Sequence, residues 1–172
     1  MFNKIFGKPN IEPIPDHIRE SIERELGELF YFFTLNLSYS AMASEQSRLD
    51  ADVTFKKMEP LANLAQASVE KLQKLWPAGT LALSHLRKMV NILPDWFSNF
   101  RAWQNLIHDF EDDKIAEINK GRYQHFVMKN REYSARMDEN FMNAKEQLEK
   151  YGIEFDAIYE KSNERVISYL TS

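Results

Sequence analysis

The sequence contains no cysteine among its 172 residues. Without thiols the chain cannot form disulfides, cysteine-ligated zinc sites or iron–sulfur clusters, and it has no thiol nucleophile for catalysis. Disulfides are rare in the reducing cytoplasm, so the absence of cysteine fits that compartment. We therefore expect a cytoplasmic protein.

Glycine and proline are also scarce, with five and six residues. Both residues interrupt helices, so their scarcity favours long helices. The five glycines are isolated from one another, which excludes a glycine-rich phosphate-binding loop. No stretch alternates between apolar and polar residues as a half-buried strand does, and the sequence therefore predicts an all-α fold.

The composition is that of a folded protein without a strong charge. Hydrophobic residues make up 44% of the chain and charged residues 28%, and the net charge is −4. This balance supports a globular core and a length of about one domain. A nucleic-acid-binding protein normally carries a strongly basic surface, so we expect no nucleic-acid partner.

Residues 27–42, GELFYFFTLNLSYSAM, form the most apolar part of the chain. The uncharged run extends only from Leu29 to Ser44 and contains several polar residues, whereas a membrane-spanning helix needs roughly 20 predominantly apolar residues. We expect no transmembrane segment. The opening MFNKIFGKPN is too short for a secretory signal, although its apolar residues and lysines predict a weak contact with a membrane or granule surface.

This apolar stretch has two apolar faces when it is read as a helix at about 100° per residue. The first stripe comprises Ile22, Leu26, Leu29, Phe30, Phe33 and Leu37, and the second comprises Phe32, Leu35, Tyr39 and Met42. Between them run four small residues that would let another helix approach closely: Gly27, Thr34, Ser38 and Ala41. A surface helix normally has one apolar face. This helix is therefore either covered on both sides within its own chain or uses its second face to bind another molecule.

The remaining hydrophobic rhythm predicts an elongated helical bundle of about five or six helices. Two of these helices are long, at about 16–58 and 112–151, and Gly152 is expected to close the second. Pro60 is expected to start a new helix or kink the old one, and Pro94 to end a short helix before Asp95 caps the next. Residues 1–15 are expected to form an extended, proline-containing arm, and residues 16–172 a single helical-bundle domain.

A metal or catalytic centre finds little support in the sequence. A ferritin-like di-iron site needs a Glu three residues before a His on each of two helices, but the residues three before the four histidines are Ile14, Ala82, Asn105 and Arg122. Weak metal-ligand candidates are His108, Asp109 and Asp112, although acidic residues at a helix start also complement its dipole. We expect no cofactor, and a metal- or small-molecule-binding helical enzyme remains an alternative.

The central segment has a surplus of aromatic residues. Trp96, Phe97 and Trp103 do not fall on one line, so the helix that carries them is apolar over a wide arc, as the first helix is. Aromatic residues are enriched in protein interfaces. The sequence therefore predicts a non-enzymatic interaction protein, that is, an adaptor, an assembly factor, a chaperone-like or immunity-type binder, or an oligomer. The predicted interaction residues are Phe32, Leu35, Tyr39, Met42, Trp96, Phe97 and Trp103.

One alternative places the apolar faces on a non-protein surface. Residues 35–46, LNLSYSAMASEQ, resemble the helical segments of phasins, which cover storage granules. The resemblance implies an amphipathic protein that coats a lipid or polymer surface.

Overall fold

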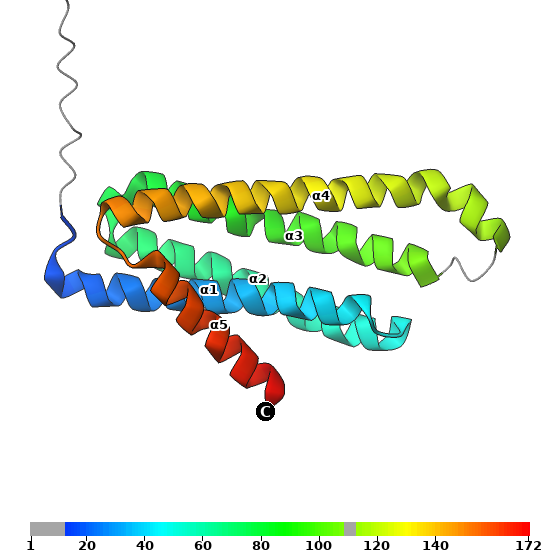
Figure 1. The fold of residues 1–172 in the computed structure, drawn as a ribbon, viewed down its shortest axis with the longest axis horizontal. Helices are drawn as coiled ribbons and strands as arrows, with labels where there is room; N and C mark the ends of the chain where they lie inside the picture. Colours follow the sequence, from blue (N-terminus) through cyan, green and yellow to red (C-terminus); the bar gives the residue numbers. More distant parts are fainter. Residues whose placement is uncertain (1–12, 109–112) are drawn as a thin grey trace, which may run out of the picture.

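The computed structural model describes residues 13–108 and 113–172, with the exception of the side chains of Arg48, His108 and 113–119. These residues form five α-helices and one 3-10 turn, and no strand occurs among them (Figure 1). The elements are α1 (Asp16–Ser44), α2 (Arg48–Leu75), η1 (Pro77–Gly79), α3 (Thr80–His108), α4 (Asp113–Lys150) and α5 (Phe155–Thr171). The predicted all-α helical bundle is confirmed.

The bundle consists of two helical hairpins and one crossing helix. α1 packs along α2, α3 packs along α4, and α2 joins the two hairpins by packing on α3. α5 returns from the end of α4 and crosses α1 at a steep angle, so that its last turns point away from the bundle (Figure 1). Within the described residues, no Cα atom of α1 lies within 8 Å of a Cα atom of α4. The bundle is therefore open along the side between α1 and α4.

The predicted long helix at 16–58 is wrong, because α1 ends at Ser44 and α2 begins at Arg48. Ser47 caps α2, since its Oγ accepts a hydrogen bond from the Asp50 backbone N at 3.4 Å and donates to the Asp50 carboxylate at 2.6 Å. Serine followed three residues later by an acidic residue is a known start signal for a helix. The hydrophobic periodicity continues across residues 45–47, and the sequence pattern therefore did not predict the turn there.

The predicted helix end at Pro94 is also wrong. Of the two alternatives predicted for Pro60, the start of a new helix is wrong, and a helix that continues through the proline agrees with the structure. Both prolines lie inside continuous helices, Pro60 in α2 and Pro94 in α3. An internal proline removes one backbone hydrogen bond and bends the helix without necessarily ending it, and here the buried residues on either side keep both helices packed. The second long helix is confirmed as α4. Gly152 follows it with φ of +73°, the left-handed conformation that glycine adopts at low cost.

Four aromatic side chains, which we call the aromatic cluster, hold three helices together. Phe30 of α1 is fully buried, and its ring centroid lies 6.0 Å from Phe141 of α4 and 4.9 Å and 5.6 Å from Phe155 and Tyr159 of α5. All three pairs have the edge-to-face geometry that aromatic rings prefer. The cluster thus bridges α1 and α4 at the end where α5 begins, where their backbones do not meet.

We predict that Phe30→Ala lowers the free energy of unfolding by about 3–5 kcal/mol, because it removes a fully buried ring and leaves a cavity at the junction of three helices. Urea denaturation measures the change. The matched control is Leu81→Ala, whose side chain is 57% exposed and whose removal should cost under about 0.5 kcal/mol. Similar losses for both variants would contradict the role assigned to the cluster.

Candidate functional site

The second face of α1 is divided between the protein interior and the surface. Leu35 and Tyr39 are buried, Phe32 is half-buried against the core, and Met42 is 41% exposed. The Lys57 ammonium of α2 lies 5.4 Å from the centre of the Tyr39 ring. Leu35 and Tyr39 therefore lie in the interior of the chain, and only Met42 of this stripe is left largely open.

The three aromatic residues predicted on the central segment lie in different surroundings. Phe97 of α3 packs edge-to-face on Phe55 of α2, with ring centroids 5.5 Å apart. Trp103 is half-buried and lies 5.4 Å from Phe100, between ring centroids. Trp96 is 7% exposed and is the member of the three that borders the open side of the bundle.

A cavity of about 190 Å³ occupies that open side, and we call it the α1–α4 groove. Its lining comes from four helices and is mostly apolar: Phe33, Leu37, Trp96, Ser134, Met137, Asp138, Phe141 and Tyr159. Ser134 and Asp138 are exposed and lie on α4. The structure therefore presents an apolar floor with a polar edge, between two helices whose backbones do not touch.

Small residues on α1 explain why α5 crosses where it does. The Ser162 hydroxyl of α5 donates to the Gly27 carbonyl at 3.0 Å. A Cβ atom added at Gly27 would lie 3.8 Å from the Ser162 hydroxyl oxygen, which is an ordinary van der Waals contact. Glycine here permits the close approach of the two helices without being sterically obligatory. Farther along α1, Thr34 and Ser38 are half-buried and Ala41 is exposed. The predicted line of small residues thus starts beneath α5 and continues beyond the crossing.

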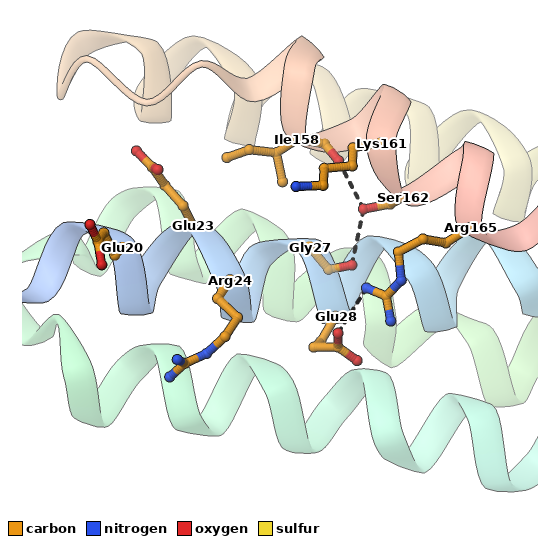
Figure 2. A pocket seen from close by; sticks show the side chains of 9 residues that line it. All are labelled: Glu20, Glu23, Arg24, Gly27, Glu28, Ile158, Lys161, Ser162 and Arg165. Atoms are coloured by element: carbon orange, nitrogen blue, oxygen red, sulfur yellow. Dashed lines mark hydrogen bonds and ion pairs between the residues drawn. The ribbon is translucent and has the colours of Figure 1, made fainter.

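A second cavity, of about 390 Å³, lies beside this crossing and is lined by residues of α1 and α5 (Figure 2). Its walls carry charges of both signs, and the Arg165 guanidinium of α5 pairs with the Glu28 carboxylate of α1 at 2.8 Å. The Ser162 hydroxyl also lies 2.8 Å from the Ile158 carbonyl, so its proton is directed at two carbonyls of the backbone. No histidine is among the residues that line this cavity. The serine therefore fastens α5 to α1 and is not set up as a nucleophile.

The described residues hold no group of three or more potential metal ligands. The metal candidates Asp109 and Asp112 lie outside the described residues, as does the side chain of His108. None of the described helices is both long enough and apolar enough to cross a membrane. No known protein family, curated protein or solved structure matches this chain.

The pKa of Tyr39 gives a test of how α5 covers α1. Burial, followed by a hydrogen bond to Tyr169 of α5, raises this pKa from 10.0 to about 12. The folded state thus favours the neutral phenol. The stability that results is fully present below pH 10 and is lost as the pH rises from 10 to about 12.

We predict that Tyr39→Phe flattens the fall in the free energy of unfolding over this pH window, because phenylalanine cannot ionise. Urea denaturation of both proteins between pH 9 and 12 measures the difference. Tyr169→Phe removes the hydrogen bond but leaves Tyr39 buried, so it should have a smaller effect in the same direction. Parallel pH profiles for Tyr39→Phe and the unmodified protein would contradict the assignment.

Proposed function

We propose that this chain is a non-enzymatic helical interaction protein whose α1–α4 groove receives a helix, and that the helix is the end of α5 from a second copy of the chain. The observation that carries the proposal is the pairing, on one chain, of an open apolar groove with a helix end that exposes apolar side chains. Ile167 is 62% exposed and Leu170 is 36% exposed, both on α5.

The groove has the properties of a helix-binding surface. Helices that pack directly have Cα atoms within 8 Å of one another, as α1 and α2 do, whereas no described Cα atom of α1 lies within 8 Å of one of α4. The space between them is lined by side chains such as Leu37, Trp96 and Met137. An amphipathic helix commonly binds in such a groove by inserting residues spaced three or four apart.

α5 supplies a fitting occupant. Ile167 and Leu170 are three residues apart, so they lie on one side of the helix. Residues near the start of the same helix, Phe155 and Tyr159, already pack at one end of the groove through the aromatic cluster. The proposed interface therefore continues an interface that exists within the chain, and uses the apolar turns of α5 that its own bundle leaves exposed.

A second copy satisfies both surfaces at once. If α5 of each protomer enters the groove of the other, the two contacts are related by a two-fold axis and the assembly closes as a dimer. Burial of Ile167 and Leu170 removes apolar surface from water, which drives association. A closed dimer also avoids the open-ended growth that a head-to-tail contact would give.

Sedimentation velocity over a range of concentrations tests the proposal. We predict that the unmodified chain forms a dimer and that Ile167→Asp combined with Leu170→Asp raises the dimer dissociation constant at least about 100-fold, because two carboxylates would enter an apolar groove. Ser134→Trp, a change on the exposed edge of the groove, should have the same effect by filling it. Circular dichroism establishes that each variant is folded.

Matched controls come from exposed leucines outside the proposed interface. Leu64→Asp and Leu81→Asp change side chains that are 45% and 57% exposed, and they should leave the dimer intact. A chain that is monomeric at every concentration, or a dimer that survives both the α5 and the groove variants, would overturn the proposal.

A further inference from the structure

The first turns of α5 are fixed to the bundle. Phe155 is 1% exposed, and Tyr159 packs edge-to-face on Phe30 and Phe141. Withdrawing either ring from the aromatic cluster would leave a cavity at the junction of three helices. A movement of α5 that keeps this cluster intact therefore has to begin after Tyr159.

The second half of α5, residues 162–171, is fastened to α1 mainly by polar contacts. The Arg165 guanidinium pairs with the Glu28 carboxylate at 2.8 Å, and these side chains are 44% and 35% exposed. Farther along the helix, Tyr169 and Tyr39 form a hydrogen bond. An exposed ion pair and a hydrogen bond that water replaces on release each contribute little to stability. This half of α5 can therefore leave α1 at a low cost.

Ser162 marks the turn at which α5 can bend. Its hydroxyl lies 3.0 Å from the Gly27 carbonyl oxygen and 2.8 Å from that of Ile158, and it donates its proton to both. A serine that bonds to the carbonyl four residues before it slightly destabilises a helix and often bends it. In the next residue, Asn163, the buried Oδ1 receives no hydrogen bond from the described part of the chain. A buried acceptor without a donor is unfavourable, which further weakens the position of this half on α1.

The apolar residues in the second half of α5 do not all face solvent. A helix that binds in a groove commonly inserts residues spaced three and four apart. In α5 this spacing is met by Asn163, Val166, Ile167 and Leu170. Ile167 and Leu170 are exposed, but Val166 is 2% exposed because it packs within its own chain. All three apolar side chains become available to a groove only when this half of α5 leaves α1.

We propose that α5 bends at the turn 158–162 and that its second half exchanges between two positions, one on its own α1 and one in the α1–α4 groove of a second copy. This inference rests on the proposed function and adds its regulation, since the position on α1 is an autoinhibitory contact that withholds Val166 from the interface. Only the fraction of chains with a released α5 can dimerise, so a small released fraction weakens the measured dimer affinity. Glu28 and Tyr39 therefore control a groove that neither residue lines.

A reversible cross-link tests whether α5 has to leave α1. A Cβ atom at Gly27 would lie 3.8 Å from Ser162 Oγ, so cysteines at these two positions are within reach of a disulfide, and the native chain has no cysteine. Gly27→Cys combined with Ser162→Cys is oxidised at low protein concentration, and mass spectrometry establishes that the bond is intramolecular. Sedimentation velocity then compares the oxidised and reduced forms. We expect the reduced protein to dimerise and the disulfide to raise the dimer dissociation constant at least about 30-fold, because the released fraction falls.

Two substitutions in α1 test the fastening without altering α5, and they decide the question if the double-cysteine protein does not fold. Glu28→Gln combined with Tyr39→Phe removes the ion pair and the hydrogen bond. The dimer dissociation constant should fall at least about three-fold, because a larger fraction of chains has a released α5. The matched control is Glu20→Gln, an exposed carboxylate that lines the same cavity as Glu28, and it should change nothing.

The outcomes separate this inference from the proposed function. A double-cysteine protein that dimerises equally well when oxidised and when reduced would overturn the release of α5 and leave the dimer standing. A dimer that is unchanged or weakened by the paired substitutions at Glu28 and Tyr39 would overturn it as well. If the unmodified chain and the reduced protein are monomeric at every concentration, the proposed function fails and this inference fails with it.

Discussion

The aromatic cluster around Phe30 is the contact on which the arrangement of the other elements depends. α1 and α4 are not in backbone contact in the described part of the chain, so side chains must bridge them. Phe30 meets Phe141 across the gap, and Phe155 and Tyr159 complete the cluster from α5. Fully buried aromatic side chains contribute several kcal/mol each, which is a large fraction of the total stability of a domain. This cluster fixes the start of α5 and, with it, the closed end of the bundle.

The end of α5 is held in a different way. Beyond the cluster, α5 touches α1 through the Ser162–Gly27 hydrogen bond and the Arg165–Glu28 ion pair, and the Arg165 guanidinium lies 4.5 Å from the centre of the Tyr31 ring. These polar contacts lie at an exposed crevice, where an ion pair is worth little. The last turns of α5 contact α1 through the hydrogen bond between Tyr169 and Tyr39, and they leave Ile167 and Leu170 exposed. The bundle is thus closed at one end by aromatic packing and left open along the groove, and the proposed self-association follows from that asymmetry.

The sequence pattern was sufficient for the fold class and insufficient for the turns. The long apolar rhythm predicted helices throughout, and α4 and its Gly152 cap lie where the pattern placed them. The break between α1 and α2 was missed because the turn between them, residues 45–47, is short and the spacing of the apolar positions continues across it. Ser47 and Asp50 form the cap that starts α2. Pro94 was predicted to end a helix, and Pro60 either to start a new helix or to kink the old one, since a proline disfavours a helix locally. Tertiary packing carries both helices through.

The candidate site was predictable only in part. The two apolar faces of α1 were visible in the sequence, and the structure places Leu35 and Tyr39 of the second face in the interior. The line of small residues from Gly27 to Ala41 was the one local signal of a helix crossing. The α1–α4 groove itself depends on which helices fail to meet. This property is not encoded in the spacing of residues along one helix.

The most direct measurement uses the absence of cysteine from the native chain. Two single-cysteine variants, Leu170→Cys and Ser134→Cys, are purified separately, mixed and oxidised, and the products are separated by mass. A disulfide requires Cα atoms within about 7 Å, so it reports the contact between the end of α5 and the groove of another copy. The account predicts a mixed disulfide dimer that joins residue 170 of one protomer to residue 134 of the other. A dimer that forms in solution but gives no mixed disulfide would contradict it.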